Sequence, residues 1–320
     1  MAEEAGNSKF EMAEKDYDSF FLDHLQSVRS ASGEYYLNQK FVGKGGNGTA
    51  FLVTCTSGVN QGIQFALKVF HKISDQKRRE RFLEEVNHYQ NLKHPALLGF
   101  HDTGTYKSGE REYPFAVVDY VPENLESLIG FGAPRLTRLD ALRYLYNVTS
   151  GAAYLHGQKY PIVHRDIKPA NILVHGQSAR LGDLGLAKVL MADGGKEDAE
   201  EVAAYAAMPF FHRTPELVAI AKGENVDLSP ASDIYQLGLV LYRCLTGFNP
   251  QKRPQAVTDA IQLDVRNVAG ASGARLDALL ASMLETDPSK RPTAKDVLQK
   301  LNLIHFEICR ADLVATGIMR

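Results

Sequence analysis

The sequence predicts an α+β protein with a β-rich first part and a mostly helical second part. Between residues 35 and 119, short runs of alternating apolar residues are typical of strands, and a charged stretch at residues 75–92 has the pattern of a helix. After the polar link at residues 122–124, apolar residues recur at helical spacing, as in 139–148 and 234–245. Strands followed by helices in this order predict two lobes joined by a short hinge.

The boundaries follow from these changes of pattern. Apolar residues at helical spacing within residues 10–29 predict an amphipathic helix that packs on the main domain. The expected order is a helical extension over 1–34, a main domain over 35–303 and a tail over 304–320. Within the main domain we expect a first lobe over 35–119, a hinge over 119–124 and a second lobe over 125–303.

Composition narrows the class of protein. Of the 320 residues 44% are hydrophobic and 23% charged, and the net charge is −2, so no basic field predicts a nucleic-acid partner. Three scattered cysteines fit neither a disulfide framework nor a zinc site, which favours a reducing compartment. The first residues are acidic, and no run reaches the roughly 18 apolar residues of a membrane helix, so we expect a cytoplasmic chain without a membrane span. No pattern indicates the oligomeric state.

A glycine-rich stretch, GKGGNG at residues 43–48, precedes an apolar strand. It is open to two interpretations, a glycine-rich hairpin or a turn whose backbone N–H groups approach phosphate oxygens. A dinucleotide-binding fold requires a helix after the glycines, and here a strand follows. The next strand carries Lys68 between the apolar Ala66 and Phe70, so its charge needs a partner, and Glu85 on the edge of the helical stripe is the candidate.

The strongest motif is HRDIKPAN at residues 164–171. Six specified residues in eight positions arise by chance in on the order of one in a hundred thousand chains of this length. Asp183-Leu184-Gly185 and Thr214-Pro215-Glu216 follow it in order, with two further stretches at 232–247 and 287–298. The order of the set, rather than any single motif, carries the inference.

With these motifs, residues 36–301 resemble a eukaryotic-like serine/threonine protein kinase. The resemblance implies a bilobal kinase fold, MgATP as the phosphoryl donor and serine or threonine hydroxyls of proteins as acceptors. It makes Asp166 the catalytic base, Lys168 a cation for the γ-phosphate, and Asn171 and Asp183 the Mg²⁺ ligands. It also pairs Glu216 with Arg291 and lets Asp233 brace the backbone of the catalytic loop.

The resemblance further implies the ATP site. Lys68 holds the α- and β-phosphates in an ion pair with Glu85, Val118 is the gatekeeper, the backbone of Asp119 and Val121 bonds the adenine, and Leu173 lies beneath it. The full set of ATP-binding residues is Val42, Gly43, Lys44, Gly45, Gly46, Gly48, Ala50, Ala66, Lys68, Glu85, Val118, Asp119, Val121 and Leu173.

The chain departs from the family pattern at three places. Ala50 replaces a valine over the adenine, Leu184 replaces a phenylalanine after the metal-binding aspartate, and Met208-Pro209 replace the Gly-Thr pair before the substrate-facing loop. In the family, that threonine normally bonds the catalytic aspartate and lysine. Its absence here means that the choice of acceptor does not follow from the resemblance.

The acidic segment at residues 193–211 replaces the usual phosphorylation site. From residue 183 to 213 Tyr205 is the only hydroxyl-bearing side chain. One hypothesis is that Glu197, Asp198, Glu200 and Glu201 partly stand in for a phosphate facing Arg165; the other is a solvated acidic loop. For the whole chain, the alternatives to an active kinase are a catalytically dead scaffold or nucleotide-sensing module, and a small-molecule phosphotransferase.

Overall fold

The computed structural model describes residues 20–45, 48–129, 136–183, 188–189, 211–268 and 273–315. The chain divides into two compact units. The first comprises Met1–Lys93 and Leu98–Val121, and the second His94–Leu97 and Pro122–Arg320.

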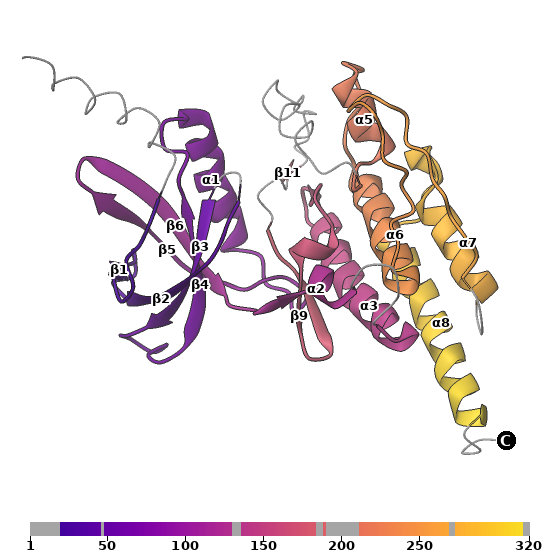
Figure 1. The fold of residues 1–320 in the computed structure, drawn as a ribbon, viewed down its shortest axis with the longest axis horizontal. Coiled ribbons are helices and arrows are strands. Elements are labelled where there is room, and N and C mark those ends of the chain that lie inside the picture. Colours follow the sequence, from indigo (N-terminus) through magenta and orange to yellow (C-terminus); the bar gives the residue numbers. More distant parts are fainter. Residues whose placement is uncertain are drawn as a thin grey trace, which may run out of the picture. The chain divides into compact units, whose positions relative to one another are not determined.

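A six-stranded antiparallel sheet forms the first unit, in the order β1-β2-β3-β4-β6-β5 (Figure 1). Its strands are β1 (Ser27–Arg29), β2 (Tyr35–Lys44), β3 (Gly48–Cys55), β4 (Gln64–Phe70), β5 (Phe100–Ser108) and β6 (Arg111–Asp119). The helix α1 (Gln76–Tyr89) contacts β6. The alternating pattern that predicted strands reflects a core in which Phe51, Leu67 and Phe115 are fully buried.

The helix predicted over residues 10–29 is wrong in its described part, residues 20–29. There the chain turns and then adds β1 to the edge of the sheet against β2. Leu25 has a φ of 62°, which ends any helix, and its side chain is exposed, whereas Phe20 and Val28 lie in the core. The apolar residues thus fill sites beside the sheet rather than one face of a helix. Residues 1–19 lie outside the described part.

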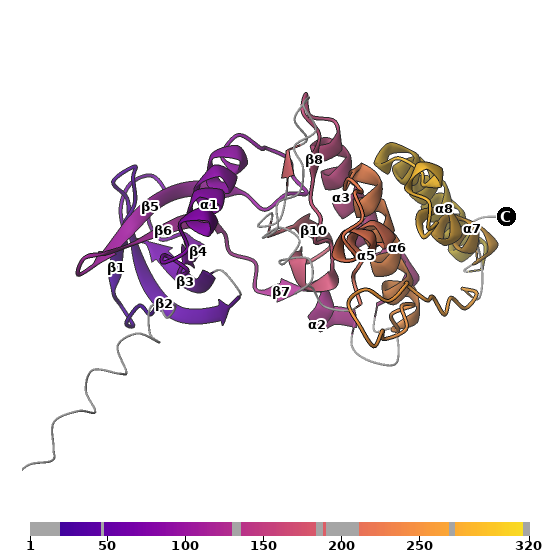
Figure 2. The ribbon, with the colours of Figure 1, turned by 90° about the horizontal axis from the view of Figure 1, so that it is seen from above.

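The second unit is mostly helical (Figure 2). Its helices are α2 (Leu125–Ile129), α3 (Arg138–His156), α5 (Pro215–Ala221), α6 (Pro230–Thr246), α7 (Gly273–Met283) and α8 (Ala294–Ala315). A small sheet contains β7 (Glu123–Asn124), β9 (Ile172–His175) and β10 (Ser178–Leu181), and β8 (Ile162–Val163) pairs with β11 (Lys188–Val189). Two 3₁₀ turns lie at Pro169–Asn171 and Pro288–Lys290.

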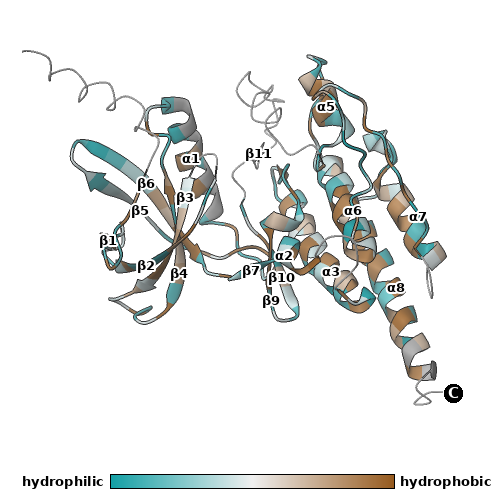
Figure 3. Cartoon of the chain, in the orientation of Figure 1, coloured by the Kyte–Doolittle hydropathy of each residue, from teal (hydrophilic) through white to brown (hydrophobic). Residues whose placement is uncertain are grey.

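Helix α6 is the buried centre of this unit. It begins at the capping box of Ser229 and Ser232, has Pro230 in its first turn, and ends at Gly247 with a left-handed φ of 77°. It contacts α3 and α7, and Figure 3 shows brown, hydrophobic stretches along α6 and α8. Helix α8 continues without a break past residue 303, where a tail was predicted to begin. In the described residues no helix combines the length and the apolar character needed to cross a membrane.

A buried ion pair joins distant parts of the second unit, as predicted. Nη1 of Arg291 lies 2.6 Å from Oε1 of Glu216, and Nη2 lies 3.1 Å from Oε2. Arg291 also donates to the carbonyls of Glu285, Thr286 and Ala231, so every face of the guanidinium is used. The side chains are 0% and 3% exposed. The pair fixes the start of α5 against α6 and the turn before α8.

Replacing Arg291 with methionine should lower the free energy of unfolding by about 3–5 kcal/mol, because Glu216 stays buried without its partner. Urea denaturation measures this loss. Lys290→Met is the matched control, since its exposed pair with Asp287 spans 3.9 Å and should contribute less than about 1 kcal/mol. Equal losses in the two variants would contradict the role given to the buried pair.

Candidate active site

The catalytic loop, residues 164–168, runs from β8 to the 3₁₀ turn that holds Asn171. Its backbone is fixed by Asp233 in the first turn of α6. Oδ2 of Asp233 accepts from the N–H of His164 at 2.9 Å, and Oδ1 accepts from the N–H of Arg165 at 2.8 Å. The predicted brace is therefore present, and it joins residues that are far apart in the chain.

His156, at the end of α3, completes this brace and was missed in the sequence. Its Nε2 lies 2.8 Å from Oδ2 of Asp233, which is completely buried. Burial by itself raises the pKa of Asp233, but the hydrogen bond and charge of His156, with His164 and the N–H of Arg165, outweigh it and hold the pKa below its usual value. The carboxylate that braces the loop therefore stays ionised.

The three predicted catalytic residues converge. Nζ of Lys168 lies 2.7 Å from Oδ2 of Asp166, and Nδ2 of Asn171 lies 2.8 Å from the same oxygen. Nδ2 of Asn171 also donates to the carbonyl of Asp166 at 2.9 Å. The second carboxylate oxygen, Oδ1, is buried and has no hydrogen-bond partner among the described residues. One oxygen of Asp166 is thus oriented by two donors, and the other, although buried, is not committed to any donor among the described residues.

The peptide before Asp183 is tied to the same loop. The N–H of Gly182 donates to the carbonyl of Asn171 at 2.9 Å, and Nε2 of His164 lies 3.1 Å from the carbonyl of Gly182. A Cβ at Gly182 would come within 3.2 Å of Leu173, so the close approach favours glycine. These bonds place Asp183, with a left-handed φ of 54°, one residue beyond the peptide that bonds Asn171. Leu184 and Gly185 lie outside the described residues.

Four of the predicted nucleotide residues of the first unit share one sheet face. Ala50 is opposite Lys68, and Lys68 is opposite Ala116, while Ala66 is opposite Val118. Residues opposite one another and residues two apart point to the same side of a sheet. Lys68 thus shares a face with Ala50, Ala66 and Val118. The side chain of Glu85 is outside the described part, so its ion pair with Lys68 stays a prediction.

The glycine-rich turn joins β2 to β3. Gly43 is opposite Ala50, and the N–H of Gly45 donates to the carbonyl of Gly48 at 2.8 Å. A Cβ at Gly48 would lie 2.9 Å from the carbonyl oxygen of Val69, so only glycine fits there without a shift. Val42 and Lys44 belong to β2, whereas Gly46 lies outside the described residues.

The strand end at Asp119 is held by two residues that the sequence did not reveal. Oδ2 of Asp119 accepts from the N–H of Gly99 at 2.9 Å, and Oδ1 lies 2.6 Å from Nε2 of His101. The N–H of Asp119 donates in turn to the carbonyl of Gly99 at 2.9 Å. This bond commits the N–H of Asp119, so the adenine contact predicted for this residue would have to use its carbonyl. Val121 is the last residue of the first unit.

Other predictions fall outside the described residues. These are the acidic residues of segment 193–210 together with Tyr205 and Met208-Pro209, so the phosphate-mimic hypothesis stays a prediction. Arg165, which it requires, has a buried side chain and a left-handed φ of 71°.

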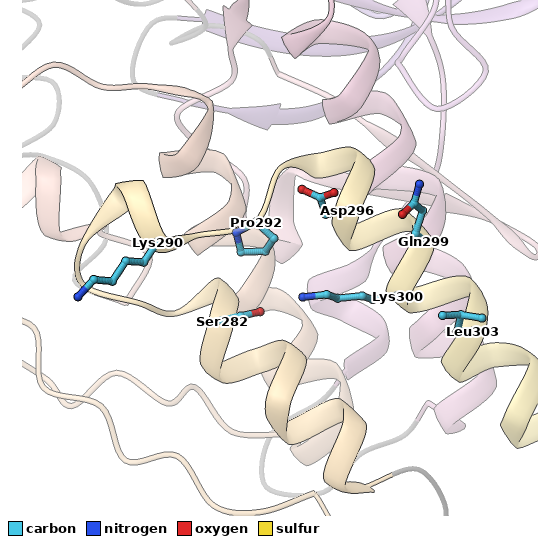
Figure 4. Close-up of a pocket in the computed structure, with 7 residues that line it drawn as sticks. All are labelled: Ser282, Lys290, Pro292, Asp296, Gln299, Lys300 and Leu303. Carbon is cyan, nitrogen blue, oxygen red and sulfur yellow. The ribbon is translucent and has the colours of Figure 1, made fainter.

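A hollow of about 470 Å³ in the second unit is lined by Ser282, Lys290, Pro292, Asp296, Gln299, Lys300 and Leu303 (Figure 4). None of these belongs to the predicted site.

His212 lies at the start of the segment that leads into α5. Burial, with smaller contributions from the charges of Arg243 and Lys168, lowers its pKa to about 3. The folded protein therefore keeps a neutral His212 under conditions in which the unfolded chain is protonated.

Because the unfolded chain binds this proton first, the free energy of unfolding should fall as the pH drops below about 6.5, by up to about 1.4 kcal/mol per pH unit. His212→Gln should remove that part of the slope between about pH 6 and 4, as measured by urea denaturation at each pH. His175→Gln, at an exposed histidine, is the control. A His212→Gln slope equal to that of the wild type would show that this histidine does not cause it.

Comparisons with known proteins identify the family of the chain. The family model of the protein kinase domain matches residues 36–302. A probable serine/threonine-protein kinase of Dictyostelium discoideum is 29% identical over 269 residues, which cover 82% of this chain and 15% of that protein. The serine/threonine-protein kinase PknB of Mycobacterium tuberculosis is 30% identical over 235 residues, covering 70% of this chain and 36% of PknB.

A third relative, the inactive serine/threonine-protein kinase PLK5 of Mus musculus, is 28% identical over 279 residues, covering 84% of this chain and 42% of that protein. The chain thus spans less than half the length of these relatives. The family match covers both units, from β2 to the first part of α8. The chain therefore belongs to the protein kinase family, among the serine/threonine protein kinases.

Proposed function

We propose that the chain is an active protein kinase that transfers the γ-phosphoryl group of MgATP to serine and threonine hydroxyls of protein substrates. The observation that carries the proposal is the arrangement around Asp166. One oxygen of this carboxylate is held by Lys168 and Asn171, and the other has no partner among the described residues. A catalytic base needs such an oriented carboxylate with an acceptor position available.

In the proposed reaction, Asp166 orients the acceptor hydroxyl and takes its proton. A bond forms between the acceptor oxygen and the γ-phosphorus while the bond from that phosphorus to the β,γ-bridging oxygen breaks, and ADP leaves. Lys168 lies beside Asp166, where its ammonium group can offset negative charge on the transferred phosphoryl group.

The residues present fit MgATP chemically. Asn171 and Asp183 offer the amide and carboxylate oxygens that Mg²⁺ prefers, and bound Mg²⁺ supplies charge neutralisation at the phosphates. Lys68 is assigned to the α- and β-phosphates with Glu85 as its partner. In the first unit, the glycine-rich turn is assigned to the phosphates, and Val42, Ala50, Ala66 and Val118 are assigned to the adenine. In the second unit, Leu173 is assigned to the adenine. We assign the kinase domain to residues 35–303. We expect the reaction to take place in the cytoplasm.

The main alternative is a kinase fold without catalysis, which acts as a scaffold or nucleotide sensor. One relative, PLK5 of Mus musculus, is an inactive kinase, which is the reason to test this alternative. Against it, Lys68, Asp166, Lys168, Asn171 and Asp183 are all residues competent for the chemistry. A small-molecule phosphotransferase is the third candidate.

Asp166→Asn should lower transfer of labelled γ-phosphate to protein at least about a hundredfold, because the amide cannot accept the hydroxyl proton. Nucleotide binding in the presence of Mg²⁺ should persist. Asp227→Asn, at an exposed aspartate, is the matched control and should keep wild-type rates. Chelation of Mg²⁺ should abolish transfer by the wild type.

Each alternative gives a different result. Equal transfer by wild type and Asp166→Asn would mean that a contaminating kinase produces the signal. Binding of MgATP without transfer to any acceptor would favour the nucleotide-sensing module. Transfer to small molecules but not to serine or threonine in proteins would favour the phosphotransferase.

A further inference from the structure

Three side-chain amides hold three successive carbonyls just before α5. Nδ2 of Asn249 donates to the carbonyl of Phe211 at 2.8 Å. Nε2 of Gln236 donates to that of His212 at 3.1 Å, and Nε2 of Gln251 to that of Arg213 at 2.6 Å. The segment 211–213 is thus fixed through its backbone by uncharged groups, and Thr214 then caps α5.

Gln236 differs from the other two amides because it also holds the catalytic loop. The same Nε2 donates to the carbonyl of Arg165 at 2.9 Å, and Oε1 accepts from the N–H of Ile167 at 2.8 Å. Arg165 and Ile167 are the two neighbours of Asp166. One side chain therefore bonds the peptides on both sides of the proposed base and, in addition, the segment 211–213.

The helix that carries Gln236 makes the link rigid. Gln236 follows Asp233 by three residues on α6, so the two side chains lie on one face of the helix. Asp233 accepts hydrogen bonds from the N–H groups of His164 and Arg165. Gln236 donates to the carbonyl of Arg165 and accepts from the N–H of Ile167. Both donor hydrogens of the Gln236 amide are committed, and the side chain is completely buried.

We propose that Gln236 is a positioning residue that sets the catalytic loop in register with the segment 211–213. The inference rests on the proposed kinase function, because the register matters only if an acceptor hydroxyl has to meet Asp166. This amide connects the peptides on both sides of Asp166 to a segment more than 40 residues later in the sequence. A small displacement of a base from its acceptor lowers the rate steeply.

Gln236→Met tests the proposal, because methionine fills a similar volume and removes all three bonds. With dephosphorylated casein as acceptor, kcat should fall by about tenfold or more and the KM for casein should rise, while the Kd for MgATP stays within about twofold. Gln251→Met removes the bond to Arg213 and leaves the bonds to the catalytic loop in place, so it should raise the KM for casein and lower kcat much less. Tyr242→Phe, which removes a backbone-binding hydroxyl from the same helix, controls for stability.

Hydrogen exchange gives a readout that does not need activity. Gln236→Met should raise amide exchange in two peptides, 162–172 and 211–217, whereas Gln251→Met should raise it in 211–217 alone. This readout separates the two proposals. If the wild type transfers no phosphate, the proposed function fails, and the exchange pattern still decides whether Gln236 couples the two segments.

A kcat for Gln236→Met within about twofold of the wild type would overturn the proposal. So would an equal loss of kcat in Gln251→Met, or unchanged exchange in 162–172. All rates are compared at a temperature at which each variant is folded. If Gln236→Met does not fold, Gln236→Asn decides, since its shorter amide cannot reach both segments. Wild-type exchange in both peptides of Gln236→Asn would then reject the coupling.

Discussion

The carboxylate of Asp233 is the interaction on which the rest of the second unit's site depends. It accepts two successive backbone N–H groups of the catalytic loop and a hydrogen bond from His156. Two N–H groups that point at one carboxylate force the chain through an unusual conformation, and Arg165 has a φ of 71°. A left-handed residue other than glycine costs on the order of 1–3 kcal/mol, which the charge-assisted bonds offset.

Helix α6 acts as a platform for segments that are distant in the sequence. Asp233 and Gln236 hold the loop around Asp166, and Gln236 reaches the segment 211–213 as well. Further along α6, Nη1 of Arg243 donates to Oε2 of Glu126 in α2 at 2.9 Å. Because Asp233 and Gln236 are completely buried, their polar atoms cannot bond water and are satisfied by protein groups instead.

The fold and the motifs could be predicted because their signals are local. The alternation in β3 and β4 and the ordered residues of HRDIKPAN need no knowledge of distant partners. The Glu216–Arg291 pair and the Asp233 brace followed from the family resemblance, and both are present. The helix expected over 10–29 failed because an apolar stripe at helical spacing also fits a turn followed by an edge strand, which only the neighbouring β2 selects.

Hydrogen bonds between residues that are distant in the sequence could not be predicted from local patterns. His156 bonds Asp233, 77 residues away, and Gln236 bonds Ile167, 69 residues away, and nothing in the neighbouring sequence marks those partners. The one available signal for Gln236 was a polar residue inside the otherwise apolar run IYQLGLVL, where a buried amide must find hydrogen bonds. His101 beside Asp119 gave no such signal, because it lies in an ordinary polar strand.

A crystal structure with Mg²⁺ and a non-hydrolysable ATP analogue tests the central claim most directly, namely that Asn171, Asp183 and Asp166 form one phosphoryl-transfer site. We expect an ion about 2.0–2.1 Å from an oxygen of Asn171 or Asp183 and from a phosphate oxygen, with Asp166 facing the γ-phosphate. A nucleotide bound without contact to these three residues, or an ion held elsewhere, would contradict it.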